Sequence, residues 1–162
     1  MQLKDQRVVL TGGASGIGAC ALEKFVTEGA AQIHVADRDS ARLAEVIKAL
    51  PADSPVVATE VDVSDRAALE HFIRSADAAM GGLDVLVNNA GIMSGSVDFP
   101  GTSLEAMNRV IDVNLVAMMI GTRLGIELMH QRGNLGIVLN TASIAAFNPQ
   151  PADPASAASN AA

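Results

Sequence analysis

Residues 8–25 have the sequence VVLTGGASGIGACALEKF, and this stretch decides the fold. A short apolar strand, Val8–Leu10, is followed by a glycine-rich turn and then by a predicted helix over Ala19–Glu28. Glycines have no Cβ, so the chain can turn tightly there and a phosphate group can approach the backbone. The helix then presents unpaired N–H groups and the positive end of its dipole to that anion. The pattern predicts a pyrophosphate site, whose candidate residues are Gly12, Ser15, Gly16, Ile17 and Gly18.

A carboxylate follows the second predicted strand. Asp37 lies nineteen residues after Gly18, directly behind the strand Gln32–Ala36. At this place it can accept hydrogen bonds from the ribose hydroxyls of NAD, and it repels the extra phosphate of NADP. Arg38 complicates the choice, because a guanidinium can hold that phosphate. The carboxylate favours NAD over NADP, and the structural alternative is a solvated turn that caps a helix beginning near Ser40.

Apolar strands alternate with helix-like stretches along the chain. The predicted strands are Val8–Leu10, Gln32–Ala36, Val56–Val61, Val85–Asn88 and Gly136–Asn140. The predicted helices are Ala19–Glu28, Ser40–Leu50, Arg66–Met80 and Leu104–Gln131, with a further helix entered near Ser156. Continuous apolar strands are typical of strands buried on both faces. The alternation predicts one α/β domain over residues 1–162, with a parallel sheet and right-handed crossovers.

The composition and net charge of the chain argue against nucleic-acid binding and membrane insertion. The chain has 162 residues, of which 49% are hydrophobic, and its net charge is −7. That charge argues against nucleic acid, whose phosphates need a basic surface. No apolar run is long enough to span a membrane and no signal segment precedes the first strand, so we expect a cytoplasmic protein without membrane contact.

Cysteine and histidine usage gives no sign of a metal site. Cys20 is the only cysteine, so an intrachain disulfide is impossible and the residue is expected to pack rather than to react. His34, His71 and His130 share no metal-ligand spacing, and we expect no bound metal.

Two further sets of residues follow predicted strands. Asp62 and Val63 come after the third strand, and Asn89, Ala90 and Gly91 come after the fourth. The carboxyl ends of parallel strands line the ligand crevice, so Asp62 is expected to meet the adenine edge of a dinucleotide, although an Asp here is also ordinary at a helix start. Amides at this place can tie strand ends together, while small residues leave room for a flat ligand.

Two polar residues are candidates for a chemical role. Asn114 lies in a long apolar helix, where Asn is a poor helix former, so either a polar function or a satisfied buried amide explains it. Ser143 follows the fifth strand, where its hydroxyl can bind a substrate oxygen, although serine in such a stretch is more often a turn residue.

Taken together, these motifs resemble those of the short-chain dehydrogenase/reductase family. The resemblance runs from about Leu3 to the last residue and rests on the ordered motifs Thr11-Gly12-x-x-x-Gly16-x-Gly18, Asp62, Asn88-Asn89-Ala90-Gly91, Asn114 and Ser143. It implies a Rossmann-type doubly wound parallel sheet in strand order 3-2-1-4-5. It also implies a nicotinamide cofactor and hydride transfer between a secondary alcohol and a ketone. The catalytic set of that family is Asn, Ser, Tyr and Lys, and Asn114 and Ser143 match the first two.

The second catalytic pair does not match. Counting thirteen residues from Ser143 gives Ser156 at the family's tyrosine position, and four more give Asn160 at its lysine position. The chain contains no tyrosine and no lysine after Lys48, so no shift of register restores the pair. A serine hydroxyl cannot be tuned toward neutral pH as a phenol beside an ammonium can. Little or no turnover is therefore expected.

The resemblance also bears on the end of the chain and on assembly. The family's last strands are absent, so residues 136–140 are expected to form an uncovered apolar edge. The resemblance implies a homo-oligomer whose subunits pair through the helix Leu104–Gln131. It also implies a small alcohol or ketone as the substrate. The alternatives are a dinucleotide-binding protein without catalysis, and a fragment of a full-length enzyme.

Overall fold

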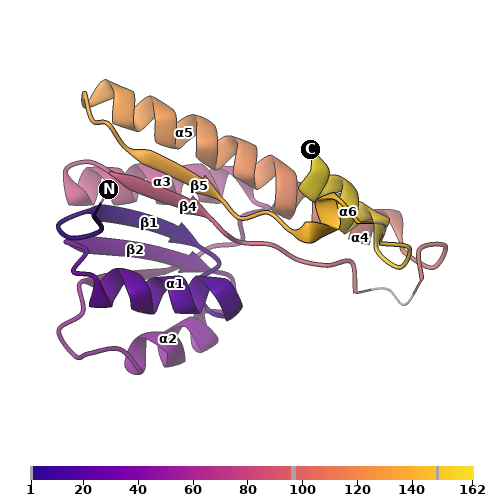
Figure 1. Cartoon of the computed structure of the whole chain (residues 1–162), viewed down its shortest axis with the longest axis horizontal. Coiled ribbons are helices and arrows are strands. Elements are labelled where there is room, and N and C mark those ends of the chain that lie inside the picture. Colours follow the sequence, from indigo (N-terminus) through magenta and orange to yellow (C-terminus); the bar gives the residue numbers. More distant parts are fainter. Residues whose placement is uncertain (1, 96–97, 149) are drawn as a thin grey trace.

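Five parallel strands form the centre of the molecule. The computed structural model describes residues 2–95, 98–148 and 150–162. The strands are β1 (Arg7–Thr11), β2 (Gln32–Asp37), β3 (Val56–Glu60), β4 (Val85–Asn88) and β5 (Ile137–Asn140). They pair in the order β3-β2-β1-β4-β5, which confirms the predicted topology (Figure 1).

Helices cover both faces of the sheet. Figure 1 shows α1 (Gly16–Thr27) and α2 (Ser40–Lys48) on one face, and α3 (Arg66–Met80) and α5 (Ala117–Gln131) on the other. Alternate strand residues therefore enter two cores. Leu10 and Val87 belong to the core under α1, whereas Val9 and Leu86 belong to the core under α3 and α5. α1 begins at Gly16, three residues before the predicted start, because the glycine-rich turn itself supplies the first helical turn.

Of the two edge strands, β3 departs from the prediction of burial on both faces, whereas β5 forms the uncovered apolar edge that the sequence predicts. Residues 57–60 of β3 are exposed, and in β5 the side chains of Ile137 and Leu139 are 37% and 49% exposed. Each edge strand has a neighbour on one side only, whereas β1, β2 and β4 are paired on both sides. Burial on both faces therefore holds for the three central strands and not at the edges.

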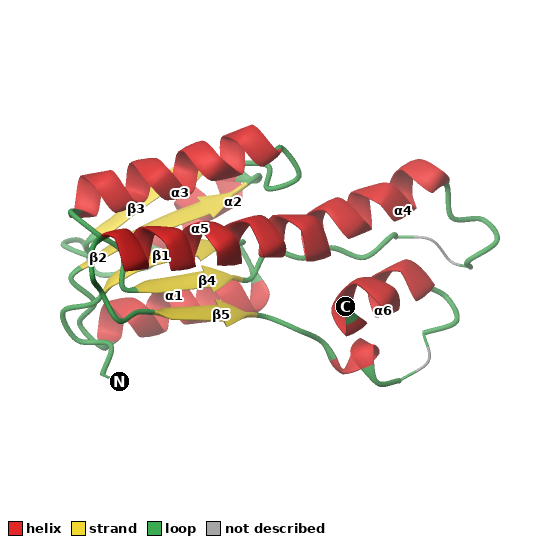
Figure 2. Cartoon of the chain, turned by 90° about the horizontal axis from the view of Figure 1, so that it is seen from above, coloured by secondary structure: helices red, strands yellow, loops and turns green. Residues whose placement is uncertain are grey.

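The helix predicted over Leu104–Gln131 consists of three segments. α4 (Leu104–Ile111) passes into a π-helical segment, Asp112–Val116, and then into α5. Figure 2 shows α4 and α5 as one long rod whose α4 end projects beyond the sheet, beside α6 (Pro154–Ala161). The wider π turn contains Asn114, and such turns frequently mark functional sites. Within the described ranges, no helix is both long enough and apolar enough to cross a membrane.

Candidate functional site

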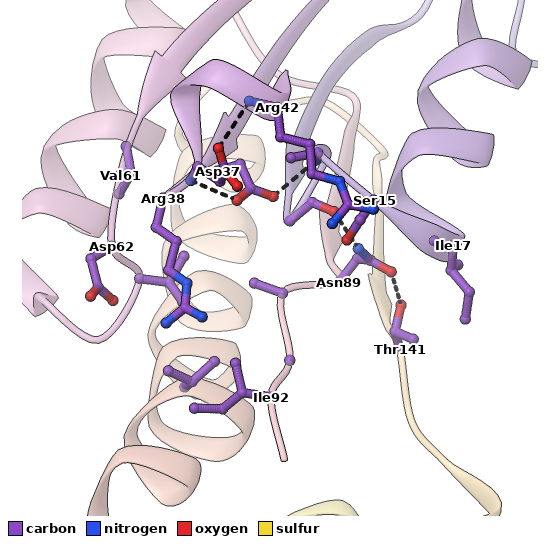
Figure 3. A pocket seen from close by; sticks show the side chains of 18 residues that line it. Ser15, Ile17, Asp37, Arg38, Arg42, Val61, Asp62, Asn89, Ile92 and Thr141 are labelled. Atoms are coloured by element: carbon purple, nitrogen blue, oxygen red, sulfur yellow. Dashed lines mark hydrogen bonds between the residues drawn. The ribbon is translucent and has the colours of Figure 1, made fainter. Parts of the chain in front are cut away.

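A cleft of about 380 Å³ opens at the carboxyl ends of the central strands (Figure 3). Its walls come from the glycine-rich turn, the ends of β2 and β3, and the segment after β4. The predicted binding residues that line it are Gly12, Ser15, Gly16, Ile17, Asp37, Asp62, Val63, Asn89, Ala90 and Gly91. The structure thus brings together residues that are far apart in the sequence, and of the predicted binding set Gly18 alone is not part of the lining.

The glycines of the turn have different physical tasks. A Cβ on Gly12 would lie 2.7 Å from Cα of Ala90, and its φ of +72° is unfavourable for other residues. A Cβ on Gly18 would overlap the carbonyl oxygen of Gly12 and lie 2.6 Å from Nδ2 of Asn89. Gly16 has nothing within 4 Å of a Cβ and borders the cleft. Gly12 and Gly18 thus let the turn pack closely against its neighbours, while Gly16 leaves the backbone open to a ligand.

The N-terminus of α1 has no side-chain cap among the described residues. Ser15 is the N-cap residue and borders the cleft, but its side chain accepts no hydrogen bond from the first turn. By contrast, α2, α3, α4 and α6 are each capped by a side chain, from Asp39, Asp65, Ser103 and Asp153. The first N–H groups of a helix have no intrahelical partner. In α1 they therefore remain available to an anion in the cleft.

Asp37 lies where the sequence predicts it, and its carboxylate is already hydrogen-bonded. Oδ2 accepts from the backbone N–H of Ala14 at 2.9 Å, and Oδ1 accepts from that of Asp39 at 3.0 Å. The first bond joins the end of β2 to the glycine-rich turn, and the second belongs to the turn before α2. A carboxylate oxygen has two lone pairs, so both oxygens keep acceptor capacity toward a ligand. The binding role and the turn role are therefore compatible at this residue.

Two arginines share this end of the cleft. Arg38 and Arg42 are exposed and both line it, and in Figure 3 the Arg42 side chain extends toward Ser15. Arg38 was singled out from the sequence, and Arg42 was not. A signal was present, because a basic side chain in the first turn of a helix opposes the helix dipole and is unfavourable there. With two guanidinium groups, this end of the cleft can attract additional negative charge.

Asp62 is held by donors from two parts of the chain. Oδ1 accepts from the backbone N–H of Ser64 at 3.0 Å and from its hydroxyl at 2.6 Å, while Oδ2 accepts from Nη2 of Arg109 at 2.8 Å. The hydrogen bonds from Ser64, together with the Arg109 guanidinium, hold the pKa of the Asp62 carboxyl below its ordinary value. Asp62 is thus an ionised acceptor at the cleft wall at neutral pH.

The asparagines at the end of β4, Asn88 and Asn89, tie strand ends together, as predicted from the sequence. Nδ2 of Asn89 donates to the carbonyls of Thr11 and Gly12, at 3.2 and 3.0 Å. Nδ2 of Asn88 donates to Oδ1 of Asn140 at 2.8 Å, which joins β4 to β5. Thr141 was not singled out from the sequence, yet it borders the cleft and donates to Oδ1 of Asn89 at 3.3 Å (Figure 3).

Asn114 bridges three segments from the π turn. Oδ1 accepts from the backbone N–H of Ile92 at 2.8 Å. Nδ2 donates to the carbonyl of Ile92 at 2.9 Å and to the hydroxyl of Ser159 at 3.1 Å. The amide is fully engaged with the segment after β4 and with α6, so its side chain acts as a structural bridge. Its neighbour Val113 lines the cleft, whereas Asn114 does not.

The remaining candidate residues make local hydrogen bonds outside the cleft lining. The Ser143 hydroxyl accepts from the backbone N–H of Ala145 at 3.2 Å and caps a short 3-10 helix. In α6, Nδ2 of Asn160 donates to the carbonyl of Ser156 at 2.8 Å. The backbone N–H of Ser156 donates to Oδ1 of Asp153 at 3.1 Å. In the described hydrogen bonds, none of these residues is joined to a group that exchanges a proton near neutral pH.

The described part of the chain contains no cluster of side chains that could bind a metal ion. No group of three or more His, Cys, Asp or Glu side chains lies close enough together to hold an ion. His34 is buried in β2, and burial lowers the pKa of its imidazole. Cys20 is exposed rather than packed inside, which corrects the expectation from its usual burial, since it lies on the outer side of α1.

Comparison with known proteins identifies clear relatives. The family model described as short chain dehydrogenase matches residues 6–162. The chain is 35% identical over 143 residues to 3beta-hydroxysteroid dehydrogenase 2 of Eggerthella lenta, covering 88% of this chain and 55% of that protein. It is 33% identical over 151 residues to the NADP-dependent (R)-specific alcohol dehydrogenase of Lentilactobacillus kefiri, covering 93% and 59%.

A solved structure of the same family has the same fold as this chain. A short chain dehydrogenase/reductase from Burkholderia phymatum, in complex with NAD, is similar with a TM-score of 0.92 and 28% identity. That match covers 99% of this chain and 57% of the other. The chain therefore spans little more than half the length of these relatives, and the part that it spans has the same fold.

Proposed function

Because this chain belongs to the short-chain dehydrogenase family, we propose that its cleft binds NAD(H) and serves alcohol–ketone oxidoreduction, with catalysis impaired in this sequence. The main support for dinucleotide binding is the N-terminus of α1, which has no side-chain cap and lies beside Gly16 at the cleft. A pyrophosphate there would receive backbone N–H groups and the positive end of the helix dipole. The nicotinamide group, when bound, supplies the hydride chemistry, and the residues of this chain hold and orient it.

The preference for NAD over NADP rests on Asp37. Its carboxylate lines the cleft at the end of β2, where it can accept from ribose hydroxyls and would repel a phosphate in their place. Arg38 and Arg42 act in the opposite direction, because they bring positive charge to the same end. The relatives include both an NADP-dependent enzyme and an NAD complex. The geometric advantage of the carboxylate, which is fixed by two backbone donors, favours NAD.

Impaired turnover follows from the residues at positions 156 and 160. In the family resemblance these positions carry the tyrosine and lysine, and here they carry Ser156 and Asn160. Loss of general acid–base help lowers rates by about 10²–10⁴. Asn160 is neutral and its amide is turned back to the helix carbonyl of Ser156, so it supplies no positive charge to the cleft. Of the two family residues that this chain keeps, Ser143 would hold the substrate oxygen, whereas the Asn114 amide is already engaged with Ile92 and Ser159 and would have to give up one of these bonds to support a relay water.

Titration of the purified chain with NADH and NADPH, followed by nicotinamide fluorescence, tests the proposal. Saturable binding is expected, with NADH preferred by about tenfold because like charges at Asp37 disfavour the extra phosphate. Tighter binding of NADPH would reverse the assignment of Asp37, and Arg38→Ala should then weaken it. Absence of binding by either cofactor would refute the cleft as a dinucleotide site. Robust cofactor-dependent oxidation by this chain would refute the predicted impairment.

Two alternatives stand beside this proposal. The first is a protein that binds a dinucleotide without catalysis, and the second is a chain that forms part of a longer enzyme. The local hydrogen bonds of Ser156 and Asn160 favour the first, and coverage of 55% of a relative's length is the observation behind the second. The mass of the natural protein distinguishes them. A mass above that of the 162-residue chain would support the longer enzyme.

Assembly into a homo-oligomer through the long helix is part of the same proposal. On α5, the side chains of Met119 and Ile126 are 61% and 58% exposed and lie seven residues apart, on one helical face. These two exposed apolar side chains are what the proposed subunit contact would cover. Analytical ultracentrifugation checks it, with a dimer or tetramer expected and a monomer at high concentration as the contrary result.

A further inference from the structure

Asp62 receives a donor from a distant helix as well as from its own turn. Arg109 lies on α4, 47 positions along the chain, and its Nη2 donates to Oδ2 at 2.8 Å. Ser64 holds the other oxygen, Oδ1, through its backbone N–H and its hydroxyl. Ser64 therefore fixes the carboxylate relative to the turn that follows β3. Arg109 fixes the same carboxylate relative to the α4 rod, which consists of α4, the π-helical segment Asp112–Val116 and α5.

The α4 rod also supplies the cleft with an apolar side chain. Val113 follows Arg109 by four residues and lines the cleft, as Asp62 and Val63 do. A flat base at this end would meet an apolar wall and a charged acceptor together. The distance between those two features depends on how the turn after β3 is held against the rod. Arg109 is the residue that joins the acceptor itself to the rod.

A second ion pair joins the same two parts of the chain without reaching the cleft. Nη2 of Arg66, at the start of α3, donates to Oδ1 of Asp112 in the π-helical segment at 3.2 Å. Neither residue lines the cleft, and neither contacts Asp62 in the described hydrogen bonds. This pair secures the rod but leaves the acceptor alone. It therefore separates a structural effect on the rod from an effect on the carboxylate.

We propose that Arg109 is a positioning residue that holds the Asp62 carboxylate in place to accept the 6-amino group of adenine. The proposal rests on the proposed dinucleotide site. Adenine carries a donor at position 6, whereas hypoxanthine carries a carbonyl oxygen there, which an ionised carboxylate repels. An acceptor fixed before binding loses little side-chain freedom when the ligand arrives, so its preference for the donor is large. Without Arg109 the carboxylate keeps Ser64 alone and can turn away toward solvent.

The test compares NADH with reduced nicotinamide hypoxanthine dinucleotide on the wild-type chain and on the variants Arg109→Ala, Arg109→Lys and Arg66→Ala. The wild type is expected to prefer NADH by about tenfold, the value of one charge-assisted hydrogen bond. Arg109→Ala should lower this preference to about threefold or less, because an exposed ion pair contributes modestly. Arg109→Lys should retain most of it, since a single donor is needed. Arg66→Ala, the matched control, should leave the ratio unchanged.

The ratio of the two affinities distinguishes positioning from general support of the fold. If Arg109→Ala weakens both ligands equally, or if Arg66→Ala changes the ratio as much, Arg109 is structural and the inference is overturned. Equal affinity of the wild type for both ligands would also overturn it, while binding of NADH would leave the proposed function standing. Failure of the wild type to bind either ligand would remove the proposed function as well. Should Arg109→Ala not fold, Arg109→Gln takes its place, with the same expected loss of preference.

Discussion

Helices α1 and α6 begin in contrasting ways, and the contrast separates binding from chemistry in this chain. The first turn of α1 has no side-chain cap among the described residues, and its N-cap residue Ser15 borders the cleft. The first turn of α6 is capped by Asp153, which is 5% exposed. Asp153 also accepts from the backbone N–H of Ser94 at 2.8 Å, so it anchors α6 to the segment after β4. One helix start is left open to an anion, and the other is closed by the protein.

The two regions also differ in what their function depends on. At α1 the proposed site consists of backbone groups whose positions are set by glycine, so it persists wherever the turn folds. At α6 the family resemblance assigns the function to the side chains at positions 156 and 160. Their replacement by serine and asparagine leaves a capped helix that is bonded to the π turn through Ser159. We therefore expect α6 to keep its place in the fold without the catalytic side chains that the resemblance assigns to it.

The largest expected effect comes from returning those side chains to α6. The double variant Ser156→Tyr with Asn160→Lys should raise NAD-dependent oxidation of a secondary alcohol by about 10²–10⁴ over the wild-type chain. A phenol beside an ammonium can exchange a proton near neutral pH, which a serine hydroxyl cannot do. NADH affinity, measured by fluorescence, should change far less than turnover.

The control for this variant is Ser156→Phe with Asn160→Lys, which restores the ring and the charge but no hydroxyl. It should remain inactive if proton transfer is what the chain lacks. The idea fails if the tyrosine and phenylalanine variants have the same turnover while both bind NADH. In that case the contrast between α1 and α6 would not be one of binding against chemistry.

The alternation of strands and helices and the glycine-rich turn could be predicted from local patterns in the sequence. Glycine spacing, together with Asp37 at the end of β2, predicts the turn and its neighbour, and the strand order follows from the family resemblance. Exposure of β3 and the π turn at Asn114 was missed, because both depend on which neighbours a segment has in space, whereas the uncovered apolar edge at β5 was predicted and is confirmed. Arg109 was missed for the same reason, because it reaches Asp62 from 47 positions along the chain. Arg42 was missed although its unfavourable place in the first turn of α2 was a local signal.

The next effect tests the backbone nature of the cradle. Gly18→Ala would place a Cβ against the carbonyl oxygen of Gly12, so the turn must shift. We expect NADH affinity to fall by at least about tenfold, since overpacking of this kind costs about 1–3 kcal/mol. Gly133→Ala is the control, because its Cβ would meet nothing within 4 Å and the residue lies outside the cleft lining, so strain from its φ of +68° should lower stability without lowering NADH affinity. Thermal unfolding measures the stability of both variants, and an equal loss of NADH affinity in both would contradict the close-packing argument.

The smallest expected effect comes from removing the cap of α6, which tests whether the starts of α1 and α6 are independent of each other. Asp153→Ala removes the acceptor for the backbone N–H groups of Ser156 and Ser94, at 3.1 and 2.8 Å. Loss of a helix cap costs about 1 kcal/mol, so amide exchange in residues 154–161 should accelerate by about fivefold. NADH affinity should stay unchanged, because the open N-terminus of α1 has no contact with Asp153 in the described hydrogen bonds. Asp53→Ala, which removes an exposed carboxylate before β3, should alter neither property. A parallel loss of NADH affinity in Asp153→Ala would mean that α6 and the cradle are held together as one unit, and that the chemistry of one end cannot be lost without weakening the binding at the other.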